Sequence, residues 1–193
     1  MRIFVAGATG AIGRFLVPLL AEAGHEVAGL TRSADKAPAL VEAGAVPVVC
    51  DVYDPRLIVE MAEFAPDLVI NQITDLPQHQ AMIALKVREL NRARTEGMDA
   101  LIHAARTAGA SRFIAQSVAF SAPAPVRKAV EHLERSTLEY PGVVLRYGYF
   151  FGPGTWYPEG TKHEPRVHVE LAAIRTVELL DAEPGVYEIV DPA

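Results

Sequence analysis

Cysteine is almost absent from this chain of 193 residues, which has only Cys50. One thiol cannot form an internal disulfide, so the chain is not a small secreted scaffold held together by such bonds. Cys50 ends the apolar run 46–50. This position favours a buried thiol in a reducing compartment over a reactive one.

Long apolar runs and a surplus of basic residues are also missing. No segment approaches the roughly 20 apolar residues that a helix needs to cross a bilayer. Met1 leads directly into an apolar run, which leaves no room for a signal peptide. The net charge of −6 provides no broad basic face for nucleic acid. His79, His132 and His163 share no metal-ligand spacing, and no Cys/His/Asp cluster suggests zinc. We therefore expect a cytoplasmic protein without a metal, membrane or nucleic-acid partner.

Glycines are present where they matter most, at the start of the chain. The apolar residues 3–6 end at Gly7, and Gly10 and Gly13 follow three and six positions later. Apolar residues at helical spacing then extend to Gly24. In a strand, turn and helix of this kind, the first glycine lets the chain reverse and the second admits a pyrophosphate. The third lets the helix pack on the strand, and the amides of the helix N-terminus face the anion. The segment predicts a dinucleotide cradle made of Gly7, Thr9, Gly10, Ala11, Ile12 and Gly13; an ordinary glycine-rich turn is the alternative.

The remaining chain alternates strand-like apolar runs with helical patterns, without repeats or low-complexity tracts. Such alternation predicts an α/β fold with a doubly wound parallel sheet, and the length suits a single domain over 1–193. We expect further strands at 26–32, 45–50, 67–73, 112–117, 141–147 and 186–190, and helices at 34–42, 55–65, 81–108, 126–138 and 171–180.

The end of the second predicted strand favours NADP over NAD. An acidic residue there would accept from the ribose 2′-hydroxyl, whereas an arginine can pair with a 2′-phosphate. The chain has Arg32 and Ser33 at this point, with Lys36 one helical turn later. Arg32 as a solvated surface residue is the alternative.

Two further strand ends supply candidate contacts. Asp51 and Val52 are placed to flank the adenine, although Asp51 could instead order the turn. Gln72 ends the fourth predicted strand, where it could reach the ribose or a substrate or cap the loop. On the predicted helix 81–108, Asn91, Arg94 and Glu96 are expected on a solvated face.

Several motifs together resemble one protein superfamily. They are the glycine motif 7–13, Gly24-His-Glu-Val27, Cys50-Asp51, Gln116-Ser117, the run 145–154, and the C-terminal segments 167–170 and 185–191. The chain is similar to the extended and atypical short-chain dehydrogenases/reductases, which include the NAD-dependent epimerase/dehydratases and NmrA-like proteins. The resemblance implies a Rossmann fold that binds NAD(P).

The resemblance also implies catalytic residues, and here the chain departs from the pattern. Ser117 matches the serine that hydrogen-bonds the substrate oxygen; a plain strand-end hydroxyl is the alternative. The usual tyrosine followed four residues later by a lysine is missing, because Ala124 precedes Lys128 at that spacing. We take Tyr149 as the substitute proton shuttle and Tyr147 as a cofactor contact. Packing of both rings against the nucleotide is the alternative.

Extended members usually carry a larger C-terminal lobe over the substrate. Here residues 149–185 supply only reduced elements of such a lobe, which is therefore rudimentary. We expect an open pocket, or one completed by a second subunit in a homo-oligomer. Trp156 and Tyr157 suit either role.

These features give three functional hypotheses. The first is an NADP-dependent oxidoreductase acting on a small organic carbonyl or alcohol, with Ser117 and Tyr149 as its catalytic residues. The second is a non-catalytic NmrA-like redox sensor that binds the dinucleotide and a partner protein. The third is a cyclase or isomerase that uses the pocket without net hydride transfer.

Overall fold

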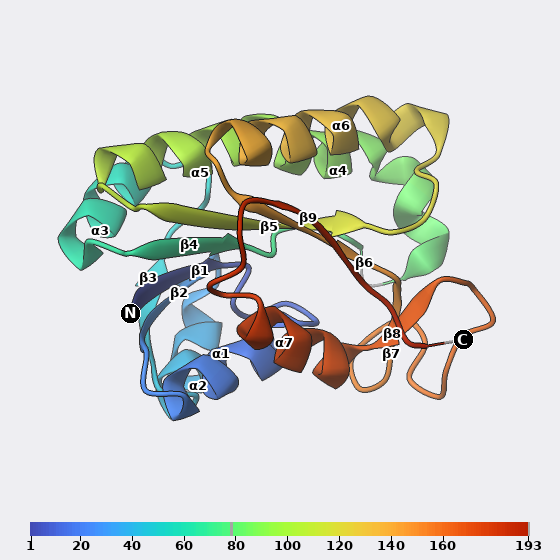
Figure 1. The fold of residues 1–193 in the computed structure, drawn as a ribbon, viewed down its shortest axis with the longest axis horizontal. Coiled ribbons are helices and arrows are strands. Elements are labelled where there is room, and N and C mark those ends of the chain that lie inside the picture. Colours follow the sequence, from blue (N-terminus) through green and yellow to red (C-terminus); the bar gives the residue numbers. More distant parts are fainter. Residues whose placement is uncertain (78, 193) are drawn as a thin grey trace.

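The computed structural model describes residues 1–77 and 79–192. Its centre is a seven-stranded sheet in the order β3-β2-β1-β4-β5-β6-β9 (Figure 1), in which every neighbouring pair is parallel. The predicted α/β class and doubly wound parallel sheet are confirmed. The strands are β1 (Arg2–Ala6), β2 (Glu26–Thr31), β3 (Ala45–Val49), β4 (Leu68–Asn71), β5 (Arg112–Val118), β6 (Val143–Tyr147) and β9 (Gly185–Ile189).

Helices cover both faces of this sheet. In Figure 1, one face carries the first, second and last α-helices, and the opposite face carries the remaining α-helices. The first group is α1 (Gly13–Glu22), α2 (Ala37–Glu42) and α7 (Val169–Glu178); the second is α3 (Arg56–Phe64), α4 (Val87–Arg94), α5 (Glu96–Thr107) and α6 (Ala124–Glu139).

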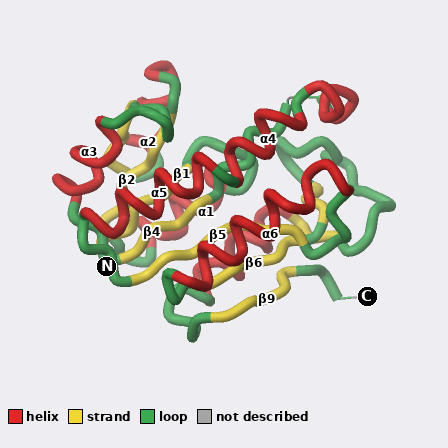
Figure 2. Tube along the Cα trace, turned by 90° about the horizontal axis from the view of Figure 1, so that it is seen from above, coloured by secondary structure: helices red, strands yellow, loops and turns green. Residues whose placement is uncertain are grey.

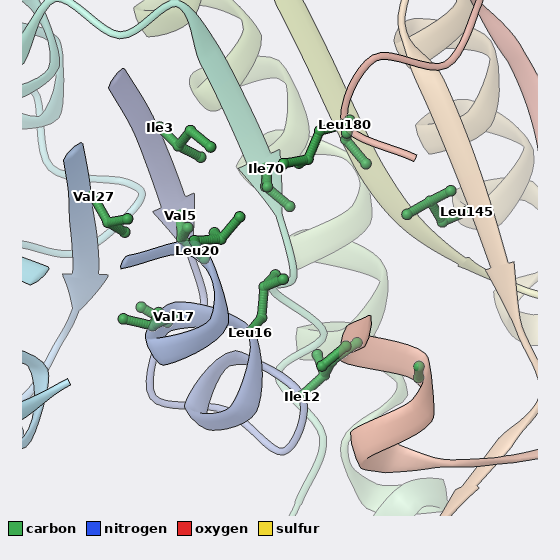
Figure 3. Packing of buried hydrophobic residues seen from close by; sticks show 14 of the residues in the cluster. Ile3, Val5, Ile12, Leu16, Val17, Leu20, Val27, Ile70, Leu145 and Leu180 are labelled. Atoms are coloured by element: carbon green, nitrogen blue, oxygen red, sulfur yellow. The ribbon is translucent and has the colours of Figure 1, made fainter. Parts of the chain in front are cut away.

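The alternation of side chains along β1 shows why both faces need cover. Ile3 and Val5 belong to the core cluster beneath α1, where Leu16 and Leu20 pack against the sheet (Figure 3). Phe4 belongs to the other cluster, which the second group of helices closes. Successive strand residues point to opposite faces, so an unbroken apolar strand requires a helix layer on each side.

The predicted single helix over 81–108 is wrong. A 3-10 helix, η2 (Gln80–Leu85), comes first, and α4 and α5 follow as separate helices. The junction lies at Thr95, whose hydroxyl donates to the carbonyl oxygen of Asn91 at 3.0 Å. A threonine hydroxyl that bonds back to the preceding turn competes with regular helical bonding. The predicted helix at 34–42 likewise begins with a 3-10 turn, η1 (Ala34–Lys36).

Residues 149–185 hold one small element that the sequence did not predict. The short strands β7 (Tyr149–Phe151) and β8 (Arg166–His168) form a separate parallel pair. The helix α7 follows and packs on the main sheet beside α1 (Figure 1). Across the described residues, none of the helices combines the length and apolarity that a membrane span requires.

Candidate functional site

A cavity of about 960 Å³ opens at the carboxyl ends of β1, β2, β4, β5 and β6. Parallel strands of a doubly wound sheet present their ligand sites at this edge. Most of the predicted site residues lie together here, whereas Ile12, Gly13 and Ser33 do not line the cavity. The predicted residues that line it are Gly7, Thr9, Gly10, Ala11, Arg32, Asp51, Val52, Gln72, Ser117, Tyr147 and Tyr149.

The turn between β1 and α1 leaves no room for side chains at two of its glycines. Gly7 has φ of 82°, and a Cβ there would lie 2.7 Å from the backbone carbon of Gln72. A Cβ on Gly13 would overlap the carbonyl oxygens of Gly7 and Ala8. At Gly10, a Cβ would lie 3.1 Å from the oxygen of Gly7. Gly7 and Gly13 therefore build the turn, and Gly10 keeps its cavity side bare.

The N-terminus of α1 has no side-chain cap, although the amides of Arg14 and Phe15 already donate to the carbonyl oxygens of Gly10 and Ile12. Its N-cap is Ile12, which makes no side-chain capping bond, and no acidic residue lies in the first turn. The Ile12 side chain points into the core instead (Figure 3). Backbone amides at a helix N-terminus need an acceptor and favour an anion. A diphosphate fits this turn, because Gly10 and Ala11 offer the cavity only small groups.

Arg32 and Lys36 border the end of the cavity nearest β2 and β3. The Arg32 guanidinium donates to Asp75 at 2.9 Å, and 63% of the Arg32 side chain is exposed. The ion pair joins the end of β2 to the loop after β4. Ser33 does not line the cavity, and its amide donates to the Thr31 hydroxyl at 3.3 Å.

Asp51 and Gln72 are both partly engaged by the protein. Asp51 accepts from the amide of Tyr53 at 3.0 Å, so it orders the turn as well as lining the cavity. The amide nitrogen of Gln72 donates to the Tyr147 hydroxyl at 3.3 Å. The Oε1 atom of Gln72 is buried and has no partner among the described residues. A buried carbonyl oxygen without a partner at a cavity wall is available to a ligand donor.

The Ser117 hydroxyl is already committed within the protein. It donates to Glu134 at 2.5 Å, and the same carboxylate accepts two bonds from Arg146 at 2.6 and 2.8 Å. Burial raises the pKa of Glu134, but the hydrogen bonds from Arg146 and Ser117 outweigh burial and hold that pKa below its usual value. Ser117 therefore belongs to a charged cluster that joins β5, α6 and β6.

The two tyrosines after β6 have different surroundings. Tyr147 is 1% exposed, and its hydroxyl lies 2.7 Å from that of Thr176. Burial raises the pKa of Tyr147 to about 12. Tyr149 is half-buried and stacks on Phe120 with ring centroids 4.0 Å apart. Burial, and to a smaller extent the neighbouring Tyr157, raises the pKa of Tyr149. Both phenols therefore keep their protons at neutral pH.

Two residues at the cavity wall make contacts that the sequence did not predict. The Trp156 indole donates to the carbonyl oxygen of Pro77 at 3.0 Å, which joins the loop after β7 to the loop after β4. The guanidinium of Arg14 fills the space beside Gly154. Both contacts connect segments far apart in the sequence, so neither spacing nor composition could indicate them.

The expectation of a solvated face for Asn91 and Arg94 is wrong, whereas Glu96 is exposed. Asn91 donates to the carbonyl oxygen of Pro125 at 2.8 Å, and Arg94 lines the cavity. The helix break at Thr95 changes the phase between the two halves of the segment. A signal was present, because Arg94 follows the buried Leu90 by four residues and so shares its helix face.

A family model supplies the identity that this geometry suggests. Residues 3–125 match the NAD dependent epimerase/dehydratase family, and this range includes the glycine turn, Arg32, Gln72 and Ser117. The chain belongs to that family. This confirms the resemblance to the extended and atypical dehydrogenase/reductase superfamily. The family name and the cradle together support a nicotinamide dinucleotide as cofactor, and members act on small molecules.

Individual relatives agree with the assignment. A 3-diazoavenalumate denitrifying reductase from a Streptomyces species is 38% identical over 182 residues, covering 81% of this chain and 59% of that protein. The chain therefore spans less than two thirds of the length of this relative. Photosystem II assembly factor Ycf39 of Synechocystis is 32% identical over 125 residues, covering 65% of this chain and 36% of that protein.

Solved structures share the fold at lower identity. The UDP-glucose 4-epimerase of Thermus thermophilus, solved with NAD, superposes with a TM-score of 0.81 at 20% identity and covers 100% of this chain and 78% of its own. A putative NAD-dependent epimerase/dehydratase from Bacillus halodurans gives 0.75 at 22% identity, covering 100% of this chain and 94% of its own.

Proposed function

We propose that the protein is an NADP-dependent oxidoreductase that acts on a small organic carbonyl or alcohol. The observation that carries the proposal is the uncapped N-terminus of α1, which opens through Gly10 onto the cavity. The Streptomyces relative, whose name describes a reductase, supports redox chemistry. A family member that lacked this cradle would have no place for the diphosphate.

The preference for NADP rests on Arg32 and Lys36, which lie together at the cavity border without a carboxylate on the end of β2. A 2′-phosphate would compete with Asp75 for the Arg32 guanidinium. We expect Arg32→Ala to weaken NADPH binding by roughly 10-fold or more, the equivalent of about 1.4 kcal/mol. Asp75→Asn frees Arg32 and strengthens NADPH binding. NADH affinity should change little in either variant.

Calorimetry with NADPH and NADH on the wild type and both variants tests this preference. Equal wild-type affinities for the two dinucleotides would contradict it. Binding of neither dinucleotide would remove the proposed function altogether.

When bound, NADPH supplies a hydride, and the chain must orient the acceptor and provide a proton. Tyr149 borders the cavity and carries its proton at neutral pH because burial raises its pKa, so it is the proposed donor. Ser117 can polarise a carbonyl only by moving its hydroxyl away from Glu134. Turnover of NADPH with a panel of ketones and enones, compared among wild type, Tyr149→Phe and Ser117→Ala, tests these roles. Unchanged turnover in either variant would remove that residue from the mechanism.

A redox sensor is the second candidate, because one observation favours it. Ala124 begins α6 at the position that the family's tyrosine would occupy, and Pro123, Pro125 and Val126 surround it at the cavity wall. A sensor should bind NADP and NADPH with different affinities and show no turnover over the same panel. Equal affinities would leave no redox signal to transmit. Product formed without added cofactor would instead favour a cyclase or isomerase.

A further inference from the structure

Arg94 is a half-buried cation at the wall of the cavity. It ends α4, and its guanidinium donates to the carbonyl oxygen of Leu90 at 3.3 Å. Among the ion pairs of residues 1–77 and 79–192, none includes Arg94. By contrast, the nearby Arg92 pairs with Glu96 at 2.7 Å. The Arg94 charge is thus partly removed from water and has no ion-pair partner among residues 1–77 and 79–192.

Such a charge does not help the fold. Taking a guanidinium out of water carries a cost that only a well-placed anion offsets. Burial accordingly lowers the pKa of Arg94, and no neighbouring carboxylate opposes that effect. A methionine of similar length would fill the same space without the cost. A cation that lies at a cavity wall without an anionic partner in the described part of the fold is suited to bind an anion from solution.

The surroundings of Arg94 indicate what kind of anion fits. Leu90 and Ala93 line the cavity on the same helix, and Val126 and Val130 line it from α6. The helices α4 and α6 run alongside each other on the same face of the sheet (Figure 2). One guanidinium among aliphatic side chains matches a single negative charge on an apolar body. A phosphate dianion would need further donors.

The anion is not the diphosphate of the dinucleotide. That group fits the N-terminus of α1, which lies on the opposite face of the sheet from α4 (Figure 1). Arg94 therefore reaches the cavity from the other side, where the wall is formed by α4 and α6. This part of the cavity wall lies on the opposite face of the sheet from the cradle helix α1 (Figure 1).

We infer that Arg94 binds the carboxylate of the substrate, which is a small organic acid with an apolar body. The planar guanidinium binds a carboxylate through two parallel hydrogen bonds. This inference deepens the proposed function and rests on it, since the acid would be the molecule that exchanges hydride with NADP(H). It names the group that holds the substrate and leaves the reacting carbon unassigned.

The test compares carboxylates with their neutral amides. Benzoate, phenylacetate and cinnamate are each titrated beside the corresponding primary amide, with and without NADPH, into wild type, Arg94→Met, Arg94→Lys and Arg88→Met. Arg88 is the matched control, because it lies on the same helix but is exposed. NADPH affinity is measured separately for every variant, so that loss of dinucleotide binding can be distinguished from loss of carboxylate binding.

We expect wild type and Arg88→Met to bind at least one carboxylate more tightly than its amide. Arg94→Met should lose that preference with roughly a 10- to 100-fold weaker affinity, and Arg94→Lys should retain part of it. Arg94→Met should also raise Tm, since it removes an unpaired charge. A wild type that prefers no carboxylate over its amide would overturn the inference, as would an unchanged preference in Arg94→Met. NADPH binding without carboxylate preference overturns only the inference, whereas carboxylate preference without NADPH binding overturns only the oxidoreductase.

Discussion

Tyr147 makes the stability of the protein sensitive to alkaline pH. Its folded pKa of about 12 lies above the ordinary value of 10.0 because the ring is buried. The folded state therefore keeps a proton that the unfolded chain loses, and stability falls as pH rises from 10 to 12. For this group alone the loss reaches about 2 kcal/mol at pH 12.

Urea unfolding of wild type and Tyr147→Phe between pH 8 and pH 12 measures this loss of stability. At pH 8 the variant should be less stable by about 1–2 kcal/mol, because Gln72 and Thr176 lose a hydrogen-bond partner. The difference should shrink as pH rises, since only the wild type has the phenol to titrate. A constant difference across the range would mean that the Tyr147 proton is not held by the fold.

Glu134 gives the opposite dependence at acidic pH. Its pKa is held below the usual 4.5, so its contribution is present above that value and is lost as pH falls through the folded pKa. We expect Glu134→Gln to lower the free energy of unfolding at pH 7 by about 1–2 kcal/mol, allowing for the partial exposure of Arg146. The gap to wild type should close as pH falls below 4.5. Glu131→Gln, an exposed change on the same helix, should show no such trend in denaturant titrations.

Residue types alone could predict the cradle but not the surroundings of Ser117 and Arg94. Gly7, Gly10 and Gly13 matter because they have no Cβ atom. The spacing of the glycines is therefore enough to predict the turn. The role of Ser117 depends on its hydrogen bond to Glu134 on another element. The role of Arg94 depends on having no ion-pair partner in the described parts of the elements around it. Ser117 shares a strand face with Phe113 and Ala115, which alternation could have shown, but its bond to Glu134 depends on how α6 packs over β5. Nothing local specifies that packing.

In the β1–α1 turn, Gly10 is expected to affect dinucleotide binding, whereas Gly13 is expected to affect the stability of the fold. Gly10→Ala places a methyl group in the cavity with only one tight contact, so we expect nearly unchanged stability and dinucleotide binding weakened at least 10-fold. Gly13→Ala forces a methyl group against backbone oxygens and should lower the free energy of unfolding by about 1–3 kcal/mol. Thermal unfolding and NADPH calorimetry on the two variants measure both effects. Equal loss of stability in the two would contradict this division.

Among the elements, strands and short helices were predictable, whereas the long segment 81–108 was not. The central strands β1 and β4 are almost wholly apolar because both faces are covered, and a glycine follows the C-cap of α1, α2 and α5. The break at Thr95 has no proline, and the nearest glycine, Gly97, lies in the first turn of α5. The Thr95 hydroxyl donates to the Asn91 carbonyl oxygen at the break, but Thr137 and Thr176 make the same bond inside unbroken helices, so this bond alone does not explain the break. The pair β7–β8 was missed because three-residue strands carry too few positions to show alternation.

At the scale of the whole molecule, the dinucleotide should act as a clamp between segments that the chain connects only weakly. The cavity is bordered by the β1–α1 turn, the loop after β4 and the loop after β7, and the last two touch through Trp156 and Pro77. A ligand that binds only the folded state adds stability by mass action. We therefore expect NADPH at 100 times its dissociation constant to raise the free energy of unfolding by about 2.7 kcal/mol.

Trp156 is the single tryptophan of the chain and lines the same cavity, so its fluorescence reports on the clamp directly. NADPH should quench its emission over the concentration range that raises Tm, because the indole lies at the border of the occupied cavity. Gly10→Ala should shift both curves to higher NADPH concentration together. Stabilisation without a change in Trp156 emission would show that the dinucleotide leaves the loop after β7 untouched. Binding would then be confined to the cradle, and the loops on either side of the cavity would move independently of it.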